Sequence, residues 1–350
     1  MADAGFVTRL QRASSRVPGA AAVKRSLHNH AAACGALYRL LTLRSEPGIT
    51  IVTYHRLFAE PDPFYGYGIP VSLFEAHLQF FRQCCTVLSL DDAITCVTGD
   101  RPLPRRGVVI TFDDGYRDVF TRAWPLLKRY RLPATLFVAV DAVERGLIWP
   151  DVVRHAVRQT AQTEVRLEHL GSGVGTLPLA SEAQRLHAVR QLDARLRAVS
   201  NDVKERALDE LTMTLLGVPR MSLTLPGLML SWEEIRRMHA EGLGIGAHSM
   251  THPVLARLSE AEAAHEIARS GAIVSERLGE PVFHFCYPFG GSEAVGPVHY
   301  RLAEAAGFRS ACTTSPGANR RDVDQFALKR IDGTYPSLRR FVGEMISHAH

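Results

Sequence analysis

Two adjacent carboxylates and a glycine directly follow an apolar run in the first third of the chain. Residues 108–112 read Val-Val-Ile-Thr-Phe, and Asp113, Asp114 and Gly115 come next. Carrying unpaired carboxylates into a dry interior would cost stability, so we expect the pair at the exposed C-terminal end of a buried strand. Glycine there permits a sharp turn. Because adjacent carboxylates repel each other unless a cation or a shared proton intervenes, the pair predicts a metal site.

A second group of candidate ligands lies in the segment Gly-Ala-His-Ser-Met-Thr-His-Pro at residues 246–253. Two histidines four residues apart can aim at one point if the turn between them is tight. A histidine on an apolar strand is more often a packing residue, so His248 and His252 alone would be a weak signal. Two imidazoles and one carboxylate, however, form a common ligand set that leaves metal positions open for water.

Three segments of the chain resemble the motifs of the polysaccharide deacetylases, also called NodB-homology enzymes or carbohydrate esterase family 4. The string TFDDG at residues 111–115 resembles the first motif and HSMTHP at 248–253 the second. The string FCYPFG at 285–290 is similar to the tyrosine-proline segment of that family. The resemblance extends from about residue 49 to residue 331. It implies an α/β fold, namely a distorted (β/α) barrel of the NodB-homology type.

The resemblance also implies roles for individual residues. It assigns Asp114, His248 and His252 to a divalent metal ion, with zinc expected and cobalt, nickel and iron open, and it makes Asp113 the general base. The backbone N–H of Tyr287 is expected to stabilise the oxyanion. The implied activity is removal of N-acetyl groups from N-acetylglucosamine-type sugars in a polysaccharide or its lipid-linked precursor. An O-acetyl sugar esterase and a catalytically silent sugar-binding homologue are the alternatives.

Two assignments rest on departures from the family pattern. Many members protonate the leaving amine with a histidine in a C-terminal leucine-x-histidine motif, which this chain lacks near its end. The sequence most resembles a circularly permuted subgroup that acts on poly-N-acetylglucosamine and carries this histidine on its first strand. We therefore assign the general acid to His55, oriented by Asp332, with a packing histidine as the alternative.

No arginine precedes the tyrosine-proline segment, so Arg330 is assigned to hold Asp113, with an ordinary ion pair at the barrel rim as the alternative.

Short β-rich runs alternate with helical patterns from residue 48 onward, which is typical of a parallel sheet built from β-α units. Eight such runs indicate a closed or nearly closed barrel: residues 49–54, 86–90, 108–112, 134–140, 243–247, 283–287, 310–313 and 327–331. We expect the barrel to span residues 47–350, with a helical insertion at 147–229. Trp149 and Trp232 flank the insertion and could stack on sugar rings, with core packing as the alternative.

The excess of positive over negative charge lies in residues 1–46, a basic N-terminal leader. The formal net charge of the chain is +5, and residues 1–45 hold seven arginines and lysines against one aspartate. The remainder is close to neutral, which argues against a nucleic-acid partner. The sequence has no stretch of about 18 apolar residues and no signal-cleavage pattern. We expect a cytoplasmic protein whose leader either is a basic tail or packed helix, or contacts the inner membrane surface.

Overall fold

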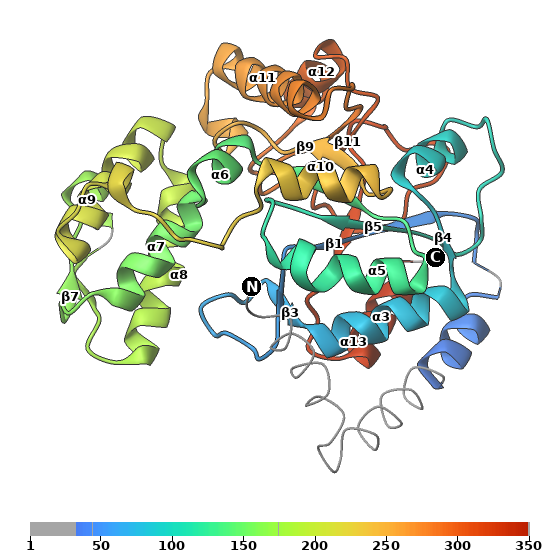
Figure 1. Cartoon of the computed structure of the whole chain (residues 1–350), viewed down its shortest axis with the longest axis horizontal. Coiled ribbons are helices and arrows are strands. Elements are labelled where there is room, and N and C mark those ends of the chain that lie inside the picture. Colours follow the sequence, from blue (N-terminus) through green and yellow to red (C-terminus); the bar gives the residue numbers. More distant parts are fainter. Residues whose placement is uncertain (1–32, 44, 174, 349–350) are drawn as a thin grey trace, which may run out of the picture.

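The computed structural model describes residues 33–348, except residues 44 and 174. Its centre is an eight-stranded parallel sheet in the order β11–β10–β9–β6–β5–β1–β12, with β4 paired to the start of β5 (Figure 1). A bridge from Cys312 to Leu328 joins the segment before β12 back to β11, so the sheet closes almost completely. The predicted distorted (β/α) barrel is confirmed, and each predicted β-rich run contains one of the strands β1 (Ile49–Tyr54), β4 (Thr86–Val87), β5 (Gly107–Phe112), β6 (Thr135–Val138), β9 (Gly244–Ala247), β10 (His284–Cys286), β11 (Ser310–Cys312) and β12 (Arg330–Asp332).

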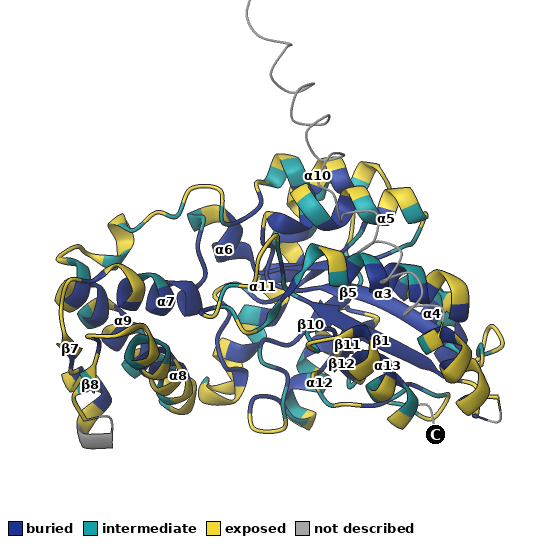
Figure 2. Ribbon diagram, turned by 90° about the horizontal axis from the view of Figure 1, so that it is seen from below, coloured by how far each residue is buried: buried dark blue, intermediate teal, exposed yellow. Residues whose placement is uncertain are grey.

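Helices surround the barrel and bury its outer face (Figure 2). Helix α11 (Glu260–Leu278) begins with a capping box formed by Ser259 and Glu262, and Gly279 ends it in the left-handed conformation. The other helices around the barrel are α3 (Val71–Cys84), α4 (Leu90–Val97), α5 (Trp124–Tyr130), α6 (Val140–Arg145), α10 (Trp232–Ala240), α12 (Pro297–Ala305) and α13 (Leu338–Ser347).

Alternation along the strands divides the core into two parts. On β1, Ile49 and Ile51 pack in a cluster with Val109 of β5, whereas Val52 and Tyr54 pack in a larger cluster that includes the surrounding helices. Successive side chains of a strand point to opposite faces, so residues of the first set face the barrel interior. By the same alternation, Thr53 near the end of β1, and Thr111 and Asp113 at the end of β5, also face the barrel interior.

A lobe of three helices stands beside the barrel (Figure 1). It contains α7 (Trp149–Gln159), α8 (Glu182–Ala198) and α9 (Asn201–Leu216), and a short antiparallel hairpin joins α7 to α8 through β7 (Glu164–Val165) and β8 (Leu177–Pro178). The three helices share a buried core of their own, centred on Val153, Leu192 and Leu211. The domain boundaries expected at residues 47, 147 and 229 stay a prediction.

Only the end of the basic leader lies among the described residues. Residues 33–41 are helical, and Tyr38 packs edge-on against Phe80 of α3. Leu37, Leu40 and Leu43 are exposed on this segment. Among the described residues, no helix has the length and apolar character needed to cross a bilayer. The membrane-surface contact of the leader and the cytoplasmic location stay predictions, since residues 1–32 lie outside the described part.

Candidate active site

The predicted site residues gather at one end of the barrel. Parallel barrel strands all end on the same face, which brings together side chains that are far apart in sequence. They line one cavity of about 230 Å³. His55 follows β1, Asp113 and Asp114 follow β5, His248 and His252 follow β9, and Tyr287 follows β10, whereas Arg330 is the first residue of β12. The cavity is also lined by side chains from the helical lobe.

Asp114, His248 and His252 converge as a buried group. Asp114 Oδ1 lies 3.4 Å from His248 Nε2 and 3.2 Å from His252 Nε2. Within the described part of the chain this carboxylate oxygen has no hydrogen-bond partner, although it is buried. Asp114 and His252 also adopt positive φ angles of 75° and 56°. Such backbone strain costs about 1–3 kcal/mol for a residue other than glycine, and it concentrates at functional sites.

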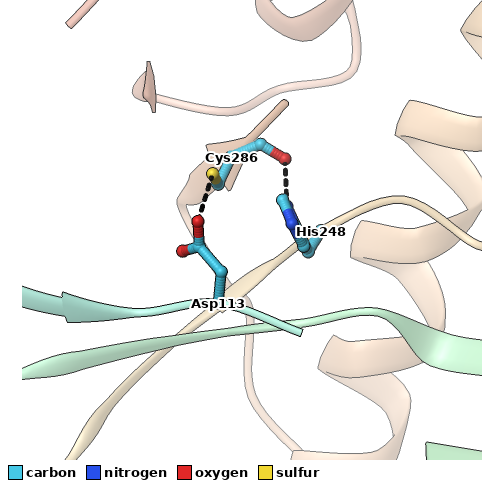
Figure 3. Close-up of side chains that lie close together, drawn as sticks. All are labelled: Asp113, His248 and Cys286. Atoms are coloured by element: carbon cyan, nitrogen blue, oxygen red, sulfur yellow. Dashed lines mark hydrogen bonds between the residues drawn. The ribbon is translucent and has the colours of Figure 1, made fainter. Parts of the chain in front are cut away.

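A backbone carbonyl fixes the protonation of His248. His248 Nδ1 lies 2.7 Å from the carbonyl oxygen of Cys286, as Figure 3 shows. A carbonyl only accepts, so Nδ1 carries a hydrogen, and Nε2, 3.4 Å from Asp114 Oδ1, is the nitrogen left to bind a metal. Histidine ligands of metals are held in this way by a second hydrogen bond. The buried oxygen without a partner, the tautomer and the donor set all fit the divalent metal ion that the sequence predicts.

A second group of potential ligands, Asp113, His248 and Cys286, lies beside the first (Figure 3). Its carboxylate is already engaged, because Arg330 donates to both oxygens of Asp113. Burial raises the pKa of the Cys286 thiol to about 11, so the sulfur keeps its proton at neutral pH and donates it toward Asp113 Oδ2 at 3.6 Å. Cys286 therefore supports both neighbours. Sequence reasoning missed this role, and the only available signal was its place in the third motif.

Arg330 binds Asp113 through two hydrogen bonds from its guanidinium. Its two terminal nitrogens donate to Asp113 Oδ1 at 2.9 Å and Oδ2 at 2.8 Å, and both side chains are almost fully buried. Thr313 and Thr53 hold the arginine from the other side. Burial alone would raise the pKa of Asp113, but the Arg330 charge outweighs it and lowers that pKa to about 2. Asp113 is therefore ionised at neutral pH, and its predicted contact with Arg330 is confirmed.

His55 lies across the cavity from the metal group, near Asp113. Its Nε2 is 3.8 Å from Asp113 Oδ2, and 27% of its side chain is exposed. Its ring meets Tyr67 edge-on at 5.6 Å, and its buried Nδ1 has no hydrogen-bond partner among the described residues. The expectation that Asp332 orients His55 is wrong, because the exposed Asp332 carboxylate accepts from the backbone of Thr334 instead.

The structure corrects the expected role of Tyr287. Tyr287 lines the cavity, but its backbone N–H donates to the carbonyl of Cys312 at 3.0 Å as part of the barrel, and its hydroxyl donates to Phe326. This N–H is therefore occupied and does not serve an oxyanion. Phe289, two residues later, lines the same cavity with a φ of 61°, and its N–H has no acceptor in the described part of the chain.

The family model for polysaccharide deacetylases matches residues 100–167 and 195–310, which is more than half of the chain. The chain belongs to the polysaccharide deacetylase family. A Bacillus subtilis relative, YxkH, whose name places it among the polysaccharide deacetylases, is 22% identical over 264 residues. That match covers 75% of this chain and 64% of the relative, so the chain spans just under two thirds of the relative's length.

Further similarities are found to one curated protein and to two solved structures. A 36-residue segment, 10% of the chain, is 50% identical to 5% of the poly-beta-1,6-N-acetyl-D-glucosamine N-deacetylase of Escherichia coli K12. Among solved structures, the Streptococcus pyogenes deacetylase PplD in complex with acetate has a TM-score of 0.57 at 16% identity, covering 87% of this chain and all of that one. IcaB from Ammonifex degensii has a TM-score of 0.56 at 21% identity, covering 87% and 98%. These two structures support the fold, while the circular permutation stays a prediction.

Neither tryptophan proposed for sugar stacking lines this cavity. Trp149 is buried and donates its indole N–H to the carbonyl of His252 at 2.9 Å, so it fixes the loop that carries a candidate ligand. Trp232 packs against the barrel core on α10. Other residues that line the cavity were not predicted from the sequence, because they lie outside the three motifs. They include Tyr67, Tyr116, Arg154, Arg197 and Thr314.

Replacing Arg330 by methionine is expected to destabilise the protein by about 3–5 kcal/mol at pH 7, because Asp113 would be left charged and unpaired in the interior. The pKa of Asp113 is lowered below its unfolded value of about 3.9, so the pair contributes stability above pH 4 that is lost as the pH falls toward 2. The deficit measured by urea unfolding should thus be smaller at pH 3 than at pH 7. Arg340→Met, at an exposed position on α13, is the control. Equal deficits in the two variants would contradict the argument.

Proposed function

We propose that the chain is a metal-dependent hydrolase that removes N-acetyl groups from N-acetylglucosamine-type sugars in a polysaccharide or its lipid-linked precursor. One observation carries the proposal. A buried Asp114–His248–His252 group, suited to a divalent ion and by its donors to zinc, lies beside an ionised Asp113 that Arg330 holds away from it. The name of the Escherichia coli relative supports an N-acetylated glucosamine as the substrate.

The cavity residues divide the proton transfers between them. When bound, the divalent ion would supply Lewis acidity toward a carbonyl oxygen and a water. Asp113 accepts the proton of the attacking water, because its Oδ1 keeps a lone pair beyond the one bound by Arg330. His55 Nε2, which faces the cavity, donates a proton to the departing amine. The N–H of Phe289 is the candidate donor to the oxyanion.

The proposal is tested by counting two products of one reaction. The full chain loaded with zinc is incubated with an oligosaccharide of β-1,6-linked N-acetylglucosamine, and released acetate and free amine are both measured. We expect one new amine for every acetate. A matched O-acetylated, non-acetamido oligosaccharide should release far less acetate.

Two outcomes of this assay would contradict the proposal. Acetate released from the O-acetylated substrate alone would identify an esterase. Saturable oligosaccharide binding by the zinc-loaded protein without any acetate release would identify a catalytically silent sugar-binding protein.

A further inference from the structure

Three arginines line the cavity, and only two of them have a carboxylate of their own. Arg330 is bound by Asp113 through two hydrogen bonds. Arg154 donates to Asp193 Oδ2 at 2.7 Å. Arg197 reaches the same oxygen of Asp193 only at 3.8 Å, beyond hydrogen-bond distance. The third guanidinium therefore brings a positive charge to the cavity wall that no neighbouring carboxylate fully offsets.

Arg197 is held in place without using its hydrogen-bond donors. It lies in the last turn of α8, and its guanidinium carbon sits 4.5 Å from the centre of the Phe289 ring. Stacking on an aromatic face fixes the plane of a guanidinium and leaves the donors at its edge free. Within the described part of the chain, its side-chain N–H groups donate to no acceptor, and 45% of the side chain is exposed. The exposed carboxylate of Glu293 attracts it only from a longer range.

The Phe289 ring connects this arginine to the proposed reaction centre. It also contacts the ring of His252, a candidate metal ligand, at a centroid distance of 4.8 Å. Arg197 thus lies close to the metal group without contacting it, at the part of the cavity wall supplied by the helical lobe. A bound divalent ion would make the cavity still more positive, so a neutral sugar would leave this charge without a counter-ion.

We propose that Arg197 forms an anion subsite beside the deacetylation site and binds a carboxylate or phosphate group of the substrate. A guanidinium pairs with either oxyanion through two parallel hydrogen bonds, which gives both affinity and orientation. The inference rests on the proposed function and narrows its substrate to an acidic one. The oxyanion has two possible sources, a uronic acid next to the acetylated sugar in a polymer or the phosphate that links the sugar to a carrier.

The test compares three substrates that differ in charge. They are a neutral N-acetylglucosamine oligosaccharide, an oligosaccharide alternating N-acetylglucosamine with a uronic acid, and N-acetylglucosamine 1-phosphate. Wild type should have the highest kcat/KM for one of the two acidic substrates, and which one it is identifies the source. In Arg197→Gln the ratio of acidic to neutral kcat/KM should fall about 10-fold or more through KM, since charge-assisted hydrogen bonds contribute about 1.5–3 kcal/mol.

Two further variants make the result specific. Arg197→Lys should restore part of the ratio, because a lysine keeps the charge but not the planar fork. Arg190→Gln, at an exposed position on the same helix and outside the cavity, should leave the ratio unchanged. A wild type without preference for either acidic substrate, or an unchanged ratio in Arg197→Gln, would overturn the subsite.

Failure of the proposed function would be seen separately. If none of the three substrates releases acetate, the deacetylase proposal fails, and equilibrium binding of N-acetylglucosamine 1-phosphate and of the uronic acid oligosaccharide then decides the subsite. Binding of either that weakens about 10-fold in Arg197→Gln, but not in Arg190→Gln, supports an anion site. Binding that is equal in both variants, or no binding at all, overturns it.

Discussion

Asp113→Asn is expected to lower the deacetylation rate by about 10²–10⁴-fold while zinc stays bound. The substitution keeps the size and shape of the side chain, but an amide cannot take a proton from water at neutral pH. The wild-type carboxylate is ionised because Arg330 lowers its pKa to about 2, so the base is in its active form across the neutral range. Rate is measured by acetate release and zinc by elemental analysis of the dialysed protein.

The control for Asp113→Asn must also lose a buried carboxylate. Asp118→Asn meets this need, because Asp118 is buried and bound by Arg56 at 2.9 Å but does not line the cavity. Both variants leave an arginine without its carboxylate, so a loss of rate caused by lower stability should appear in both. A rate for Asp113→Asn within 10-fold of wild type, or an equal loss in Asp118→Asn, would contradict the role of Asp113 as the base.

His248→Ala is expected to weaken zinc binding by at least about 100-fold and to abolish acetate release. Even changes to groups that only orient a ligand cost about 10- to 100-fold in metal affinity, and this change removes a ligand together with its anchor to the Cys286 carbonyl. Asp114 and His252 alone do not complete a three-ligand set. Zinc content after dialysis against a weak chelator gives the readout.

A matched control for His248→Ala is His284→Ala. His284 is also a buried histidine near β10, but it bonds Ser310 and Asp91 and lies outside the cavity. This variant should keep its zinc. If His248→Ala retains one zinc per chain, or both variants lose it equally, the assignment of His248 as a ligand is wrong.

The site residues that could be predicted from the sequence are those that directly follow a predicted strand within a recognisable motif. The string from Thr111 to Gly115 combines a buried strand with two carboxylates and a turn, and the histidine pair follows another strand in the same way. Parallel strands ending on one face of a barrel then bring these segments together, because the architecture leaves no other arrangement. Arg330 was assigned on other grounds, because no arginine precedes the tyrosine-proline segment and residue 330 offers a cation on the last predicted strand.

The rest of the site depends on contacts between elements that are distant in the sequence, and local sequence patterns do not predict such contacts. The N–H of Tyr287 is occupied only because β11 lies beside β10, a pairing that no motif encodes. Arg154 and Arg197 reach the cavity because the lobe packs beside the barrel, and their helices carry no chemical signature. The contact between Trp149 and the carbonyl of His252 is of the same kind. Each is a consequence of tertiary packing.

The central claim is that Asp114, His248 and His252 hold one metal ion with Asp113 left outside its ligands. A crystal structure of the protein grown with zinc, with anomalous data collected at the zinc edge, tests this directly. The account predicts one anomalous peak at about 2.0–2.2 Å from one atom of each of the three residues, with Asp113 still bound by Arg330. A peak at the Asp113–His248–Cys286 group, or no peak in a protein that releases acetate, would contradict it.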